Sequence, residues 1–312
     1  MALNKKGIYF TLMSLVFVVL FAFVLTLPKH DVLGKKNTNI ELRVDTMNTF
    51  LEDLEKDLSR SLYISSFRSL LGFEQYIVNS GEFLTSTDAF LEMIRNGTLD
   101  GQGLNIMQDS TFDAWLEKIS LESAKLNIIS NFTIYDISIY QDSPWDVKSR
   151  ADLEIHIKDI NSIAEWRINK SIITSISIIG FEDPLYIVSS YGRLTNIITE
   201  TPYANFVTGQ NVSNFISHVN NSYYKANSNS PSFLQRLVND LSPSEYGIES
   251  MVNLETVADR NLPIFSDSTI IDYLYWQNLS TGIYRLNNTP SWVRLDENHL
   301  EVYGLQDISY LE

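Results

Sequence analysis

Cysteine is absent from all 312 residues of the chain. Disulfide bonds, thiolate catalysis and zinc or iron–sulfur sites built on cysteine are therefore excluded. The absence does not identify the compartment, because many extracytoplasmic prokaryotic proteins fold without disulfides. It argues against a small secreted eukaryotic domain, a class that usually depends on such bonds.

Basic residues are scarce, since 23 Lys and Arg stand against 38 Asp and Glu, for a formal net charge of −15. The only adjacent basic pairs are Lys5–Lys6 and Lys35–Lys36. A chain this acidic repels phosphate backbones, so we expect no nucleic-acid partner. The acidity favours solubility, with cation binding as the lesser alternative.

Motifs for catalysis are also missing. The chain has no H-E-x-x-H, G-x-S-x-G, Walker A or G-x-G-x-x-G pattern. Its four histidines are far apart in the sequence: His30, His156, His218 and His299. Carboxylate pairs such as Asp296–Glu297 occur, but an acidic composition produces them without a catalytic role. We expect no enzyme activity, no cofactor and no metal site.

Two acidic segments have alternative interpretations. Residues 100–105 are similar to a calcium loop but lack its Asp-x-Asp-x-Asp spacing and terminal Glu, so a turn is predicted. Glu182-Asp183-Pro184 is also predicted to be a turn, because Pro after Asp commonly forms one. A cation-binding corner or a contact surface is the alternative for this second segment.

A long apolar run stands near the start of the chain. Ile8 to Leu27 contains twenty residues without a charge, Gly or Pro. As a helix it spans roughly 30 Å, the thickness of a bilayer's hydrocarbon core. Pro28 and Lys29 come next with no A-x-A cleavage pattern, so the segment is predicted to be a retained transmembrane anchor rather than a cleaved signal.

The orientation of this anchor is predicted from the length and the sequons of the chain after it. Lysines flank the anchor on both sides in similar number, so the positive-inside rule does not decide. Long domains translocate largely regardless of charge. Seven N-x-S/T sequons also lie beyond the anchor, at Asn96, Asn131, Asn169, Asn211, Asn220, Asn278 and Asn287. We therefore expect a single-pass protein of the cell membrane whose C-terminal domain is extracytoplasmic.

The N-terminus resembles a prepilin-type signal, called class III in archaea. Lys5-Lys6-Gly7 directly precedes the apolar helix, and Phe10 to Leu15 is similar to the F-T-L-x-E-L start of mature type IV pilins. The resemblance implies cleavage between Gly7 and Ile8, with Lys6 beside the cut, after a cytoplasmic leader of residues 1–7. It further implies that the helix then serves as a filament spine.

One position departs from this family. After cleavage the fifth residue would be Leu12, where major pilins carry a glutamate that is thought to pair with the neighbouring subunit. Some large minor pseudopilins lack this glutamate too. The resemblance therefore points to a minor pilin or pseudopilin, and a plain signal anchor is the alternative.

Helical periodicity begins after a short polar break predicted at Gly34–Asn39. Apolar residues recur at steps of four and three, at Ile40, Val44, Met47, Leu51, Leu54 and Leu58. This helix is predicted to end near Val78, before Asn79-Ser80-Gly81. Its stripe packs either on its own domain, which we favour, or as a seam between subunits. Shorter helices are predicted for residues 88–95 and from Ser110.

The period changes to alternation near Asn127. Three or more antiparallel strands with one buried face are predicted between residues 127 and 200. Residues 201–312 are expected to be mixed, with a short helix after Ser232 and a buried strand at residues 270–276. The predicted class is α+β, with an anchor (8–27), a helical region (40–126), a central antiparallel sheet and a mixed C-terminal region.

Together these features predict a membrane-anchored extracytoplasmic structural or assembly protein that resembles a minor type IV pilin or pseudopilin. Its expected partners are the lipid bilayer, other pilin-like subunits and an assembly platform. The second hypothesis is a single-pass surface adhesin or envelope binding module without filament assembly. The third is an extracytoplasmic hydrolase that uses two distant carboxylates.

Overall fold

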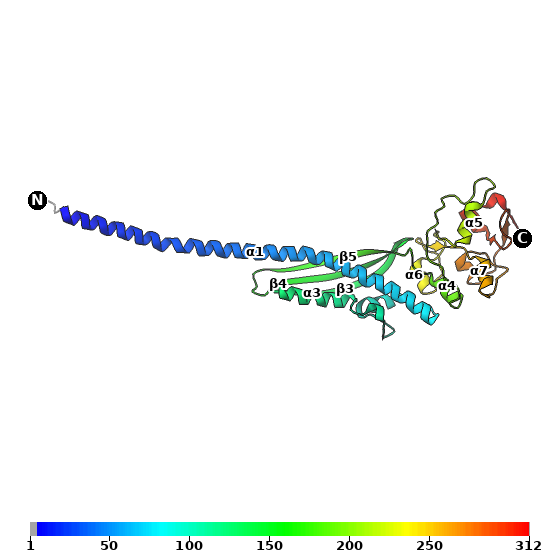
Figure 1. The fold of residues 1–312 in the computed structure, drawn as a ribbon, viewed down its shortest axis with the longest axis horizontal. Coiled ribbons are helices and arrows are strands. Elements are labelled where there is room, and N and C mark those ends of the chain that lie inside the picture. Colours follow the sequence, from blue (N-terminus) through cyan, green and yellow to red (C-terminus); the bar gives the residue numbers. More distant parts are fainter. Residues whose placement is uncertain (1–4, 312) are drawn as a thin grey trace.

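The protein is an α+β chain in which one very long helix leads into a domain with antiparallel sheets (Figure 1). The computed structural model describes residues 5–311, and it describes the side chains of residues 13–23 and 40–310. Within these described residues no helix has a stretch long and apolar enough to cross a membrane. The predicted span also includes residues 8–12 and 24–27, whose side chains lie outside the described part.

Helix α1 runs without interruption over Lys5–Ser80, so the break predicted at residues 34–39 is wrong. That segment has one glycine and no proline, and its lysines, asparagines and threonine each cost well under about 1 kcal/mol in a helix. The predicted end is confirmed. Gly81 has a left-handed φ of +69°, and its N–H donates to the carbonyl of Ile77 at 2.9 Å.

Two shorter helices come next, as predicted. α2 spans Ala89–Asn96 and ends at Gly97, which has a φ of +71°. α3 spans Phe112–Lys125, and its N-cap is Thr111 rather than Ser110, since the Thr111 hydroxyl accepts from the N–H of Ala114 at 3.2 Å. The elements between these helices are β1 (Thr98–Leu99), β2 (Gln102–Gly103) and the 3-10 helix η1 (Asn105–Met107).

The acidic loop at residues 100–105 is a turn at its start, as predicted. Asp100 and Gly101, both with positive φ, connect β1 to β2 in a small antiparallel hairpin. The carboxylate of Glu92 accepts from the N–H of Gly101 at 2.8 Å and from the hydroxyl of Thr98 at 2.6 Å. These contacts fold the loop back onto α2.

The central sheet is antiparallel, as predicted, and it has three strands in the order β3-β4-β5. The strands are β3 (Ile128–Ser143), β4 (Asp146–Asp159) and β5 (Glu165–Ser177). Along β4 every second side chain is buried, including Val147, Leu153 and Ile155. Helix α1 packs on this apolar face over β5, and α3 packs on it over β3. The other face carries polar side chains toward solvent.

The stripe on α1 is the part that covers this sheet. Met47, Leu54 and Leu58 are at most 2% exposed, whereas Leu51 is half-buried and Ile40 is 39% exposed. All three buried residues belong to the apolar cluster that includes the inner face of the sheet. Burial within its own domain, the interpretation favoured from sequence, is confirmed for this part of the stripe.

The C-terminal region forms a second apolar cluster beyond the end of the sheet. Its helices and strands are short: α4 (Pro184–Ser189), α5 (Ser213–Asn220), β6 (Lys225–Ala226), α6 (Phe233–Leu237), β7 (Ile248–Glu249), α7 (Leu254–Asp259), α8 (Asp272–Tyr275), β8 (Tyr284–Leu286), β9 (Arg294–Leu295), α9 (Glu297–Tyr303), the 3-10 helix η2 (Gln306–Ile308) and β10 (Ser309–Leu311). In Figure 1 it lies at the far end of the molecule from the N-terminus.

Sequence patterns were less reliable in this region. The helix expected after Ser232 is α6, where Ser232 and Gln235 form a reciprocal capping box. The strand predicted for residues 270–276 is wrong. Ile271 makes a single isolated β-bridge, to Met251. Helix α8 then begins at Asp272, whose carboxylate accepts from the backbone N–H groups of Ser250 and Tyr273.

Leu54→Ala is expected to destabilise the protein by roughly 2–5 kcal/mol, because it opens a cavity between α1 and the sheet. Leu42→Ala is a matched control on the same helix, since Leu42 is 64% exposed and its loss should change stability by less than about 0.5 kcal/mol. Urea unfolding of both variants measures the difference. Equal stability of the two would contradict this packing.

Candidate functional site

The N-terminal part of α1 exposes apolar side chains. Between Met13 and Phe23, nine large hydrophobic residues are 48–69% exposed, and this part of the helix projects away from the rest of the chain (Figure 1). Lys6, Gly7 and Ile8 of the predicted processing site lie outside the described side chains. An apolar surface of this extent on a projecting helix is typical of a binding face for lipid or protein.

Three charged side chains meet in the interior between the two apolar clusters. Arg236 of α6 lies between Asp183 and Asp272, and all three are fully buried. Its Nη1 is 2.6 Å from Asp183 Oδ2 and 2.9 Å from Asp272 Oδ2, and its Nη2 donates to the carbonyl of Ile248. Burial acts to lower the pKa of Arg236, but the two carboxylates raise it above its usual value, so the guanidinium is charged.

Hydrogen bonds stabilise both carboxylates of this cluster. Asp183 also accepts from the hydroxyl of Tyr224 at 2.8 Å, and as N-cap of α4 from the N–H of Leu185 at 2.9 Å. The N–H and hydroxyl of Ser250 donate to Asp272 Oδ2 at 3.1 and 2.9 Å. Because the charges are paired and enclosed, this cluster is structural rather than a place where a ligand reaches.

The predicted turn at Glu182-Asp183-Pro184 is therefore only part of the role of Asp183. Its backbone enters helix α4 with Pro184 at the first helical position, as turn chemistry allows. Its side chain points inward to Arg236, 53 residues away in sequence. No local pattern identifies such a distant partner.

A second polar network surrounds His299 on α9. Its Nδ1 is 2.7 Å from Asp296 Oδ2 and its Nε2 is 3.2 Å from Glu249 Oε2. Glu249 also accepts from the hydroxyl of Tyr303 at 3.0 Å and from the amide of Asn227 at 2.6 Å. Burial acts to lower the pKa of His299, but the hydrogen bonds and charges of Asp296 and Glu249 raise it to about 10. The imidazole is therefore protonated and donates from both nitrogens.

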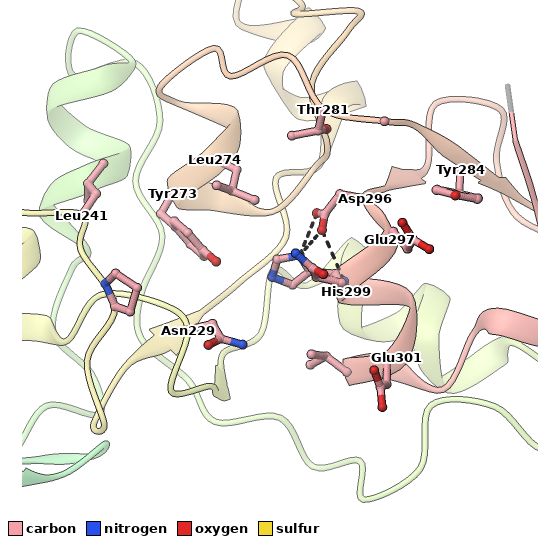
Figure 2. A pocket seen from close by; sticks show the side chains of 14 residues that line it. Asn229, Leu241, Tyr273, Leu274, Thr281, Tyr284, Asp296, Glu297, His299 and Glu301 are labelled. Atoms are coloured by element: carbon pink, nitrogen blue, oxygen red, sulfur yellow. Dashed lines mark hydrogen bonds and ion pairs between the residues drawn. The ribbon is translucent and has the colours of Figure 1, made fainter.

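His299 also lines a cavity of about 1030 Å³. The cavity lies between α8, α9, the loops on either side of α6 and the loop that precedes β8, and Figure 2 shows its side chains. Three carboxylates line it, those of Asp296, Glu297 and Glu301, while its 14 lining residues include no Lys or Arg. The carboxylate of Asp296 forms an ion pair with His299, so its charge is neutralised. The carboxylates of Glu297 and Glu301 are two further acidic groups in the lining.

Several polar groups in this cavity lack a partner among the described residues, and they include the buried hydroxyl of Thr281. Tyr273 is only 6% exposed, and its hydroxyl has no hydrogen-bond partner within the described residues. In Figure 2 that hydroxyl points into the space between Asn229 and His299. Its ring meets the imidazole edge to face, with centroids 6.3 Å apart. A buried hydroxyl aimed into an open space is a donor and acceptor ready for a ligand.

Sequence reasoning missed this site, although one signal was available. Asp296 precedes His299 by three residues at the start of a helix, which is the spacing of an N-cap carboxylate and a side chain on the same face. The other contributors come from distant segments, since Glu249 and Tyr273 lie 50 and 26 residues before His299. Their approach depends on the tertiary fold.

The remaining histidines do not join this site. His156 lies on the polar face of the sheet, where its Nε2 is 2.8 Å from Glu165 Oε1. His218 is fully buried, and burial lowers its pKa to about 3, with the charge of Lys225 acting in the same direction. Among the described side chains no group of three or more His, Asp or Glu is placed to hold a metal ion. His30 lies outside the described side chains.

Comparisons with known proteins add no relative. No protein-family model, no curated protein and no solved structure matches this chain.

The two buried histidines predict that the stability of the protein falls both above and below about pH 6.5, the ordinary pKa of histidine. For His299, with its raised pKa, the stabilisation is complete below pH 6.5 and is lost as the pH rises towards 10. For His218, with its lowered pKa, the stabilisation is present above pH 6.5 and is lost as the pH falls towards 3. We expect the melting temperature to be highest near pH 6.5.

The variant His299→Gln separates these contributions. Its melting temperature should be lower at pH 6.5 but nearly constant between pH 7 and 9.5, where that of the unchanged protein falls. His218→Gln is the control, and it should keep the alkaline fall while losing part of the acid one. Thermal unfolding monitored by circular dichroism measures all three curves. Parallel curves for the unchanged protein and His299→Gln would show that this histidine is not the group that titrates.

Proposed function

We propose that this protein is a membrane-anchored, extracytoplasmic structural or assembly subunit that resembles a minor type IV pilin or pseudopilin. One observation carries the proposal. A single continuous helix, α1, exposes apolar side chains over residues 13–23 and covers an antiparallel sheet with residues 47–58. The same helix thus connects an apolar surface to a folded domain.

Physical chemistry supports an apolar environment for the first part of α1. Each large hydrophobic side chain moved out of water gains about 1.5–3 kcal/mol. Nine of them are exposed between residues 13 and 23, inside the uncharged run Ile8–Leu27 of the sequence. A bilayer, or the apolar helices of neighbouring subunits, supplies the cover that this chain does not supply for itself.

The position of Leu12 refines the proposed role. An apolar residue where major pilins carry glutamate removes the charge that would pair with a neighbouring subunit. A subunit of this kind suits the end of a filament or a place in an assembly platform better than repeated incorporation along a fibre. The acidic domain would then be displayed outside the cell.

A second candidate function is favoured by the cavity beside His299. An anchored binding module, such as an adhesin or envelope receptor, needs a site with polar groups that a partner satisfies. The free hydroxyl of Tyr273 and the carboxylates of Glu297 and Glu301 fit that need. The two functions are compatible, because the C-terminal region, whose residues line the cavity, lies at the opposite end of the molecule from the N-terminal part of α1 (Figure 1).

Topology is tested with protease on intact spheroplasts that express the full chain. If the domain is extracytoplasmic, protease should remove the region after about Lys36 without lysis. The membrane fraction should retain a fragment that contains Ile8–Leu27. Degradation only after lysis would place the domain in the cytoplasm and refute the proposal.

Processing is tested by mass spectrometry of the N-terminus of the membrane-extracted protein. Cleavage by a prepilin-type peptidase should produce a mature chain that begins at Ile8. Gly7→Leu should block the cut, because the peptidase site accepts a residue with almost no side chain. Gly34→Leu is the matched control and should be processed normally. A native chain that begins at Met1 or Ala2 would leave a plain anchor.

A further inference from the structure

The cavity beside His299 has walls of mixed character. Its apolar side comes from Leu241, Pro243, Leu274 and Val302, and its polar side from the segment 296–301. A volume of about 1030 Å³ is at the upper end of the range for small-molecule sites, so it admits a side chain or a small ligand with room for water. A ligand with an apolar stem and a polar head matches such walls.

The charges of the lining residues determine whether the polar group of the ligand is a cation or an anion. His299 is neutralised by Asp296 and Glu249, which are themselves held by further donors. Glu297 and Glu301 line the cavity as exposed residues, and their carboxylates make no hydrogen bond or ion pair to any described residue. They stand four residues apart on α9, where like charges repel each other. A cation between them relieves that repulsion, whereas an anion adds to it.

The hydroxyl of Tyr273 is the independent sign of a ligand. The side chain of Tyr273 is only 6% exposed, and its hydroxyl is directed into the cavity without a partner among the described residues (Figure 2). The amide of Asn229, also without a side-chain partner in the described part of the chain, lies across the same space. These two groups suit a neutral hydrogen-bonding group, such as an amide, that lies apart from the charged head.

We propose that this cavity binds a primary ammonium group carried on an aliphatic stem, the chemistry of a lysine side chain on a partner polypeptide. The ammonium pairs with Glu297 and Glu301, the stem lies along the apolar wall, and the peptide amide bonds to Tyr273. The assignment rests on the proposed display of this domain as a binding module. It names the chemical group that such a module recognises.

Isothermal titration calorimetry on the full chain in detergent micelles tests this assignment. The probe is Nα-acetyl-lysine N-methylamide, and its neutral counterpart has an acetylated Nε. We expect saturable binding of the first and at least a tenfold weaker affinity for the second, since the acetylated probe has no charge to form charge-assisted hydrogen bonds with the carboxylates. Equal binding of the two probes, or binding of neither, would overturn the proposal.

Variants distinguish the cavity from the overall acidity of the chain. Glu297→Gln with Glu301→Gln should weaken the lysine probe at least tenfold. The matched control is Glu41→Gln with Asp45→Asn, an exposed acidic pair at the same spacing on α1, and it should change affinity less than about twofold, because screening removes distant charges. Equal weakening by both would show attraction by net charge alone and refute the site.

A third variant tests the unpartnered hydroxyl. Tyr273→Phe keeps the ring that packs on His299 and should weaken the lysine probe several-fold without lowering the melting temperature. An unchanged affinity would remove Tyr273 from the site. Cadaverine, a diamine of similar length without amides, separates the two sources of this chemistry. Tighter binding of cadaverine than of the lysine probe would refute a peptide partner.

All of these titrations use micelles, so they do not depend on membrane topology or processing. Loss of binding with correct topology would refute the lysine site and leave the anchored subunit intact. Binding of the lysine probe by a protein whose domain is cytoplasmic would support the lysine site and refute the anchored extracytoplasmic subunit. The two proposals therefore fail separately.

Discussion

The rest of the structure depends on the packing of α1 against the apolar face of the three-stranded sheet. A sheet of three strands has one face to bury and cannot do so alone. Residues 47–58 of α1 and the facing side of α3 cover this apolar face. At the end of β4, Oδ1 of Asp159 is 2.5 Å from Nε of Arg43 on α1. The long helix is thus part of the core of the domain, because Met47, Leu54 and Leu58 are buried in it.

A buried charge cluster joins this core to the C-terminal region. Arg236 lies between Asp183 and Asp272. Leu237, next to Arg236, belongs to the first apolar cluster, and Ile271 and Tyr273, on either side of Asp272, belong to the second. Removing one member of such a cluster leaves an uncompensated charge in the interior, which costs about 3–5 kcal/mol. The cluster therefore specifies one arrangement of the two regions, because other arrangements leave these charges unpaired.

The His299 network has a different character, since one side of it is open. Asp296 and Glu249 bind the two nitrogens of the imidazole, and the side chains of His299 and Asp296 line the cavity. Groups that face the cavity, such as the hydroxyl of Tyr273, are not satisfied by the described part of the chain. Closed networks stabilise a fold, whereas open ones are available to a partner, and this chain contains one of each.

The sequence by itself determined the elements whose signals are local. The stripe with steps of four and three predicted the packed face of α1, and Asn79-Ser80-Gly81 predicted its end. Alternation predicted the strands of the central sheet, and Ser232 before apolar residues predicted α6. Each depends on residues within one or two turns or pleats of each other. The sequence also showed the uncharged run Ile8–Leu27, on which the proposed anchor rests.

Only the tertiary structure decided which polar groups meet. A carboxylate at residue 272 looked like part of a buried strand, yet it begins a short helix and binds Arg236, 36 residues away. His299 looked isolated, yet it pairs with a glutamate 50 residues before it. Periodicity tells which face of an element is buried, but not what lies opposite, because that is set by the packing of segments far apart in the chain.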